Sequence, residues 1–140
     1  PLVTEGVFQG FLFDGYYGVR LGYASTGNSV RTGVKEPPRN GARGFYIEAG
    51  EADTVALTEG IVIEELMGTH TANPVTGDFS LGALGYVWRG GERKPFKGVM
   101  VSGNVFDLLN NVKAVGKDLT FYGTFGSPTL FIEGFKISGT

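Results

Sequence analysis

The sequence contains few side chains that can carry out chemistry, and this limits the reactions it can support. Its 140 residues include one histidine, His70, and no cysteine. A catalytic zinc ion needs three or four nitrogen, sulfur or carboxylate ligands, so a zinc site here would consist almost entirely of carboxylates. The motif H-E-x-x-H is absent, because Thr71 follows the histidine. We therefore expect no catalytic residue, metal or other cofactor in this chain.

The residues near the histidine include the types found in catalytic triads. Asp78 and Ser80 follow His70 closely in the chain, but no G-x-S-x-G turn is present to expose a serine nucleophile. We interpret His70 as a loop residue that makes ordinary hydrogen bonds. Contact with a substrate or a partner protein is the alternative interpretation, and a role as general base is a third hypothesis.

Charge and composition exclude other classes of function. The 12 basic and 14 acidic residues are scattered along the chain and give a net charge of −2, so no basic stripe predicts nucleic-acid binding. No apolar run approaches the roughly 20 residues that cross a bilayer, and we expect no membrane association. The lack of cysteine favours a cytoplasmic setting. The chain begins at Pro1 without Met, and we expect it to be part of a longer polypeptide.

Short strands dominate the expected secondary structure. The 24 glycines weaken helices and favour tight turns. Residues 79–89 alternate between two faces and lead into Gly90-Gly91, which predicts a β-hairpin with a two-residue turn and a return strand over about 94–101. By the same criteria we expect further strands over residues 7–13, 44–48, 61–67 and 129–138.

Helices are expected to be few. The strongest pattern spans Asn104 to Val115, where an apolar stripe at helical spacing follows the capping residue Asn104 and precedes Gly116. A shorter helix is expected to begin at Asp53 or Thr54 and to end at Gly60. Residues 14–21 are ambiguous, because Asp14 can cap a helix but two glycines inside it would each cost about 1 kcal/mol.

These elements predict a single domain over residues 1–140 that is mainly β. The expected fold class is β-rich α+β: an antiparallel sandwich or partly open barrel, with two or three short helices at its edge. Strands such as residues 7–13 are apolar on both faces. We therefore expect the sheet to be covered on both sides, with one cover supplied by another domain or subunit.

Four segments, in order, resemble the C-terminal domain of the TldD/PmbA family, once called modulators of DNA gyrase. They cover nearly the whole chain: LVTEGVFQGFLFDGYYGVRLGYASTGN (2–28), GTHTANPVTGDFSLGALGY (68–86), PFKGVMVSGNVFDLLNNVKAVGKD (95–118) and SPTLFIEGFKISG (127–139). In that family a TldD-type subunit binds zinc through a helical H-E-x-x-x-H motif and a cysteine near its C-terminus. It pairs with a PmbA-type subunit, also called TldE, and the pair cleaves unfolded or modified peptides.

The resemblance implies a PmbA (TldE)-type domain. The family's cysteine region should correspond to residues 120–128, which contain no cysteine. The resemblance therefore implies that zinc is held by the partner subunit, that this chain forms a heterodimer with a TldD-type subunit or a self-dimer, and that the substrate is a peptide. A non-catalytic interaction module, which binds gyrase or a toxin–antitoxin component without proteolysis, is the alternative function.

Two polar segments, residues 25–31 and 70–80, are our candidates for the wall of a shared substrate cavity or for the partner interface. Ordinary loop and turn structure is the competing interpretation of both. The candidate residues are His70, Asn73, Thr76, Asp78, Ser80, Asn28 and Arg31.

Overall fold

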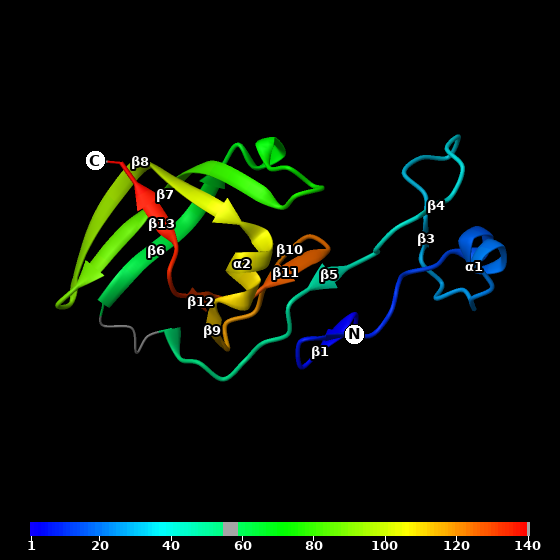
Figure 1. The fold of residues 1–140 in the computed structure, drawn as a ribbon, viewed down its shortest axis with the longest axis horizontal. Coiled ribbons are helices and arrows are strands. Elements are labelled where there is room, and N and C mark those ends of the chain that lie inside the picture. Colours follow the sequence, from blue (N-terminus) through cyan, green and yellow to red (C-terminus); the bar gives the residue numbers. More distant parts are fainter. Residues whose placement is uncertain (55–58, 140) are drawn as a thin grey trace. The chain divides into compact units, whose positions relative to one another are not determined.

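A computed structural model describes residues 1–54 and 59–139. The chain divides into two compact units (Figure 1). Unit 1 comprises residues 1–46 and 121–126, and unit 2 comprises residues 47–120 and 127–140. That residues 1–140 form a single domain stays a prediction.

Unit 1 is built from very short elements. Its two-stranded pairs are β1 with β2 and β3 with β4, and a three-stranded sheet has the order β10-β11-β5, in which β11 runs parallel to β5. The elements are β1 (Val3–Thr4), β2 (Val7–Phe8), α1 (Gly15–Leu21), β3 (Ser29–Val30), β4 (Arg39–Asn40), β5 (Phe45–Tyr46), β10 (Thr120–Tyr122) and β11 (Phe125–Ser127).

Helix α1 resolves the ambiguity of residues 14–21. Asp14 caps it, because its carboxylate accepts a hydrogen bond from the Tyr17 backbone N–H at 2.7 Å. A glycine is tolerated at Gly18 because the chain turns back onto the helix there. A Cβ at Gly18 would lie 2.9 Å from the backbone oxygen of Tyr23.

Unit 2 is organised around a four-stranded antiparallel sheet with the strand order β13-β8-β7-β6. The elements of unit 2 are β6 (Glu59–Met67), the 3-10 helix η2 (Thr69–Thr71), β7 (Asp78–Arg89), β8 (Glu92–Asn104), α2 (Val105–Asn110), β9 (Val112–Val115), β12 (Leu130–Ile132) and β13 (Lys136–Ser138). The predicted hairpin is confirmed. Gly90 and Gly91 have φ values of 59° and 85°, as a tight two-residue turn requires.

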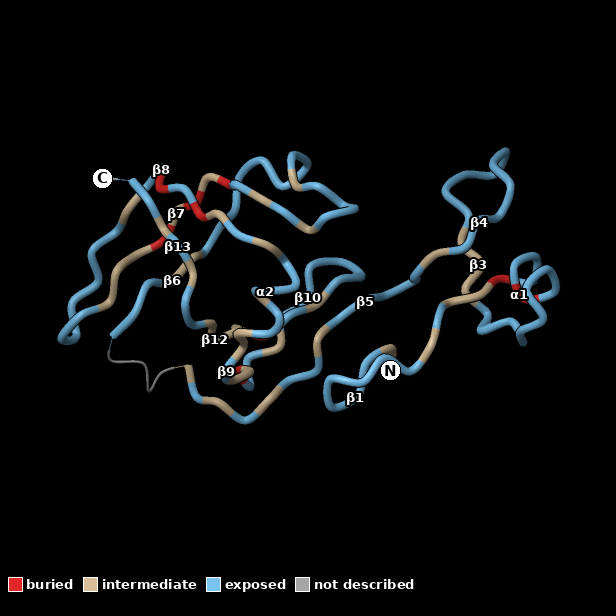
Figure 2. The backbone as a smooth tube through the Cα atoms, viewed as in Figure 1, coloured by how far each residue is buried: buried red, intermediate tan, exposed pale blue. Residues whose placement is uncertain are grey.

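The core lies on one face of this sheet. Ala83 is fully buried between neighbouring strands, and Val99 and Val101 join it from β8. Phe79 and Phe135 stack against this cluster with ring centroids 5.8 Å apart. In Figure 2 most of the buried positions of unit 2 lie on β7 and β8.

The helix predicted over residues 104–115 is only partly correct. Asn104 caps α2 as expected, but the helix ends at Asn110, and Asn111 is its C-cap. Residues 112–115 instead form β9, which pairs antiparallel with β12. Their β-branched valines suit a strand, and pairing with Leu130–Ile132 outweighs the helical spacing of the apolar residues.

Four other predicted elements differ from the observed ones. The strand expected over residues 44–48 is reduced to the two residues of β5. Residues 7–13 were expected as one strand, but only Val7–Phe8 pair, since the Glu5-Gly6 turn returns them to β1. Residues 129–138 form two strands, β12 and β13, which join different sheets on either side of Gly134, whose φ is 75°. The helix expected to begin at Asp53 or Thr54 falls largely on residues 55–58, which lie outside the described part of the chain.

The predicted fold class is confirmed as β-rich with short helices. Among residues 1–54 and 59–139, the sheets stay open and none closes into a barrel. No helix in this described part is long and apolar enough to cross a membrane.

Candidate functional site

Five of the seven candidate residues lie in unit 2, on the segment between β6 and the start of β7. His70 lies in η2 and is exposed. This short helix begins after Gly68, where the backbone takes a left-handed conformation with φ of 78°. The hydroxyl of Thr71 donates to the Gly68 carbonyl oxygen at 2.8 Å. His70 is thus held at the surface by a compact turn.

Asn73 organises the second half of the same loop. Its side-chain oxygen accepts hydrogen bonds from the backbone N–H groups of Val75 and Thr76, at 2.9 and 3.1 Å. Its backbone N–H donates to the Asp78 carbonyl oxygen, and its own carbonyl accepts from Gly77, both at 2.9 Å. Asn73 therefore closes the loop on itself, as an asparagine in an Asx turn does.

Asn104 then fastens this loop to helix α2. Its side-chain nitrogen donates to the Thr76 carbonyl oxygen at 2.8 Å and to the Asp78 carboxylate at 2.9 Å. Its side-chain oxygen accepts from the Phe106 backbone N–H at 2.9 Å. Hydrogen bonds from the side chains of Asn104 and Thr76 lower the pKa of Asp78. Asp78 is therefore a carboxylate at neutral pH and is occupied in holding the loop.

Ser80 lies apart from this network. It is exposed on β7, opposite Ser102 of β8, and the structure gives its hydroxyl no bond to His70 or Asp78. The carboxylate of Asp78 instead accepts hydrogen bonds from the side chains of Asn104 and Thr76. A triad of His70, Asp78 and Ser80 is not assembled.

Asn28 and Arg31 lie in unit 1, near β3. Asn28 is half-buried, and its side-chain oxygen accepts from the Thr26 hydroxyl at 2.7 Å while its amide donates to the Gly41 carbonyl oxygen at 3.4 Å. Arg31 is exposed, and no hydrogen bond or ion pair of its side chain occurs among the described residues. Asn28 thus has a structural role, whereas Arg31 is available to bind another molecule.

Two polar groups of unit 2 were missed as candidates. Asp118 accepts from both the backbone N–H and the hydroxyl of Thr129, at 3.0 and 2.7 Å, and these bonds lower its pKa. Lys117 forms an ion pair with Asp53 at 2.7 Å. No spacing in the sequence indicates these pairings, because the partners lie 11 and 64 residues apart.

The donor set does not fit a zinc ion. Within residues 1–54 and 59–139, no group of three or more histidine, aspartate or glutamate side chains comes together. The chain also has one imidazole and no thiol, and zinc sites are built mainly from those two donors. The candidate residues instead form hydrogen-bonded loops on a β-scaffold.

Comparison with known proteins identifies the family. A family model described as the PmbA/TldA metallopeptidase C-terminal domain matches residues 1–139. The chain belongs to the PmbA/TldD metallopeptidase family. The Metalloprotease PmbA homolog of Haemophilus influenzae is 28% identical over 141 residues, which cover 99% of this chain and 30% of that protein. A Zinc metalloprotease TldD homolog of Saccharolobus solfataricus is 24% identical over 158 residues, covering 99% and 35%.

A solved structure supports the same assignment. The crystal structure of TldE from Thermococcus kodakarensis matches this PmbA/TldD chain with a TM-score of 0.86 and 30% identity, covering 99% of this chain and 33% of that one. The predicted family resemblance is confirmed. This chain spans about a third of the length of the relatives it matches. Whether the seven candidate residues line a cavity or an interface stays a prediction.

Proposed function

We propose that this PmbA/TldD domain belongs to the subunit of a two-subunit peptidase that does not bind zinc. In this proposal a TldD-type partner holds the metal and activates water, and this chain contributes the substrate cavity and the partner interface. The observation that carries the proposal is the mismatch between family and donor set. A metallopeptidase family domain spans residues 1–139, yet the chain has one histidine and no cysteine.

The open edge of the sheet supports a role in holding peptide. Strand β6 pairs with β7 from Glu59 to Met67, and within the described sheet it has no neighbour on its other side. The backbone N–H and C=O groups on that side can pair with an extended chain. Such pairing recognises the backbone and makes little demand on side chains, which suits a peptidase that takes unfolded chains.

The side chains of β6 fit such a use. Ile61, Leu66 and Met67 are 49%, 41% and 38% exposed and can contact apolar side chains of a bound peptide. Glu64 is the extra residue at the register shift between Ile63 and Glu65. A bulge and charges on an edge strand discourage uncontrolled pairing with other sheets. The edge is therefore open to a short peptide and protected against aggregation.

The decisive experiment compares the full-length protein with and without its TldD-type partner. We expect the protein purified alone to cleave no unfolded peptide, and the pair to cleave it in a reaction that a metal chelator abolishes. Peptidase activity together with stoichiometric zinc in the protein alone would overturn the proposal. A pair that forms without cleaving any peptide would favour the interaction-module alternative.

A further inference from the structure

Unit 1 lacks an apolar core of its own. All of its residues, 1–46 and 121–126, are described, and the buried ones are Asp14 and Gly18. Large apolar side chains instead remain open to solvent along the segment around α1. Figure 2 shows this segment almost entirely exposed or half-buried. We call six of these residues the aromatic surface: Phe8, Phe11, Tyr16, Tyr17, Leu21 and Tyr23, which are 54%, 70%, 64%, 44%, 55% and 63% exposed.

The residue composition of unit 1 is that of a protein–protein interface. Interfaces are enriched in tyrosine and arginine and depleted in lysine, aspartate and glutamate. Unit 1 contains five of the chain's six tyrosines and four of its six arginines. It contains only one of the six lysines and three of the 14 acidic residues. A freely solvated surface shows the opposite bias.

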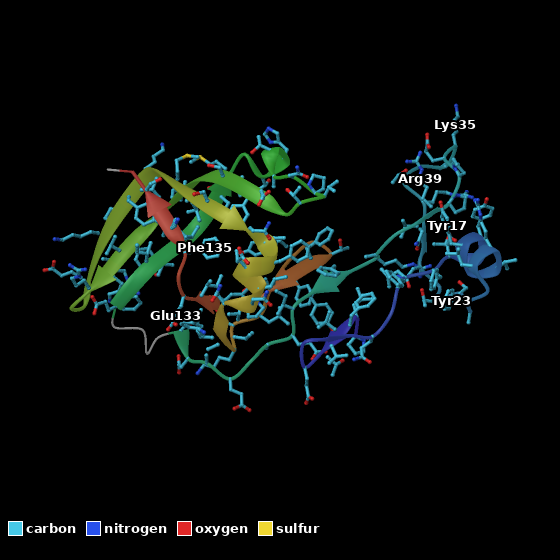
Figure 3. All side chains as sticks on the ribbon, viewed as in Figure 1. Tyr17, Tyr23, Lys35, Arg39, Glu133 and Phe135 are labelled. Carbon is cyan, nitrogen blue, oxygen red and sulfur yellow. The ribbon has the colours of Figure 1, made fainter. Side chains whose placement is uncertain are left out.

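The aromatic surface is shaped as well as apolar. Phe8 and Phe11 meet edge to face at 4.9 Å, and Phe13 stacks on Tyr23 at 5.0 Å. Next to these rings lies an open hollow of about 340 Å³, lined by Phe11, Leu12, Phe13, Tyr17, Leu21, Tyr23 and Asn40. Tyr17 and Tyr23 are labelled beside α1 in Figure 3. Pockets lined by aromatic side chains are where interface hot spots form.

The size of this surface suits a folded partner. Each aromatic side chain buries about 200 Å² when fully covered. Given their exposed fractions, the five aromatic residues of the surface leave roughly 600 Å² uncovered. A standard interface takes about 800 Å² from each partner. The remainder can come from the neighbouring β3–β4 hairpin.

The hairpin specifies the charge of the partner. Arg31, Lys35, Arg39 and Arg43 lie on or beside it, and all four are exposed. Arg39 pairs with Glu36 at 3.3 Å, whereas Arg31 and Lys35 have no carboxylate partner within the described residues. Figure 3 shows Lys35 and Arg39 on this hairpin. A complementary partner therefore presents an apolar patch bordered by carboxylates.

We propose that the aromatic surface and the β3–β4 hairpin of unit 1 form the docking surface for the TldD-type subunit. This inference rests on the proposed function, which supplies the second subunit. The partner places an apolar side chain in the hollow and carboxylates against Arg31 and Lys35.

The test measures binding between the full-length protein and the TldD-type protein of the same genome. The double variant Phe11→Glu/Tyr16→Glu places charge on two of the most exposed rings of the surface, and we expect its Kd to rise at least 100-fold. Arg31→Glu/Lys35→Glu alters only exposed charges, so it leaves folding intact. We expect it to weaken binding at least tenfold and to reduce the salt dependence of the Kd. Lys113→Glu, at an exposed position of β9 in unit 2 that lies outside both candidate segments, serves as the matched control and should change the Kd less than twofold.

Several outcomes would overturn the inference. They are an unchanged Kd in both double variants, a self-dimer lost through the same substitutions, and a monomer whose thermal stability falls while pairing is unaffected. The last result would show that other parts of the same polypeptide cover this surface. Absence of any binding between the two wild-type subunits would also overturn it.

Peptide cleavage is measured separately, so that the two proposals can fail independently. Pairing that depends on these residues without cleavage would reject the peptidase function and keep the docking surface. Cleavage by a pair whose binding is insensitive to these substitutions would keep the peptidase function and reject the docking surface.

Discussion

At the scale of single residues, Asn104 uses its whole side chain to join two parts of unit 2. It caps α2 through Phe106, and it holds the loop between β6 and β7 through Thr76 and Asp78. The cap was predictable, because asparagine before an apolar run is a helix-start signal. The bonds to the loop were not, because their partners lie 28 and 26 residues away in the sequence.

Replacement of this amide should therefore cost more than replacement of an ordinary surface residue. We expect Asn104→Ala to lower the free energy of unfolding by about 1–2 kcal/mol, the range for a lost N-cap. Urea unfolding followed by the fluorescence of Trp88, the single tryptophan, measures this. Asn110→Ala is the control, since that exposed side chain makes none of these bonds. Equal effects of the two substitutions would contradict the role of Asn104 in joining the loop to α2.

Asp118 gives a pH-dependent prediction at the same scale. Bonds from the hydroxyl and the backbone N–H of Thr129 lower the pKa of Asp118 in the folded chain. A carboxyl with a lowered pKa stabilises the fold above its unfolded pKa of about 3.9, and this contribution is lost as pH falls through the folded value. Asp118→Asn should therefore reduce the unfolding midpoint at pH 7, and the difference from wild type should shrink as the pH falls below about 3.9.

Thermal unfolding between pH 3 and pH 7 tests this dependence. Glu48→Gln, at an exposed carboxylate, is the control and should follow the wild-type curve. Thr129→Val removes the hydroxyl donor and should reproduce part of the Asp118→Asn effect at pH 7. A difference between Asp118→Asn and wild type that stays constant with pH would show that the bonds to Thr129 do not depend on the charge of Asp118.

At the scale of elements, local sequence patterns predicted the β7–β8 hairpin correctly. They failed for strands whose pairing partners are distant in the sequence. The β7–β8 hairpin was predictable because its turn, Gly90-Gly91, joins adjacent strands. Strand β9 was predicted as helix because its partner, β12, is not adjacent in the sequence. Strands β10 and β11 lie between them in the chain. In the same way, β11 pairs with β5, about 80 residues earlier. Apolar spacing carries no information about such partners.

The β6–β7 pairing depends on one glycine. A Cβ at Gly85 would collide with the carbonyl oxygen of Val62 across the strand pair. We expect Gly85→Ala to destabilise unit 2 by about 2–3 kcal/mol, since backbone yields less readily than a side chain. Gly82→Ala is a matched control on the same strand, where the nearest atom is the flexible end of Met67 at 3.2 Å. Its effect should stay within about 1 kcal/mol.

Loss of the β6–β7 pairing should also weaken the proposed binding of peptide, because β6 carries the open edge of the sheet. Amide hydrogen exchange of residues 59–67 reports the pairing directly. Fast exchange there in Gly85→Ala, with β8 still protected, would place the damage at β6. Uniform protection in both variants would show that the β6–β7 pair accommodates the added methyl group and keeps its hydrogen bonds.

At the scale of the whole molecule, the sequence predicted the β-rich class and the family, but it did not predict the division into two units. Composition revealed the class because glycine and β-branched residues favour strands and turns. The division became visible only from the tertiary contacts, and burial differs between the two units. Unit 2 surrounds Ala83, Val99 and Val101, whereas the described residues of unit 1 include no buried apolar residue. Periodicity alone gave no sign of this contrast.

The side chains that could bind zinc lead to a prediction about metal content. A structural zinc ion contributes to folding, so its removal destabilises the domain that holds it. This chain has one imidazole and no thiol. Together with the proposal that the partner holds the zinc, this leads us to expect that a chelator such as EDTA leaves the unfolding midpoint of the full-length protein unchanged when it is purified alone, and that its zinc content stays well below one ion per chain. The TldD-type partner, treated in the same way, is the positive control and should lose zinc. A chelator-sensitive midpoint in the isolated protein would mean that its side chains do hold a metal, and would remove the reason for assigning the zinc to the partner.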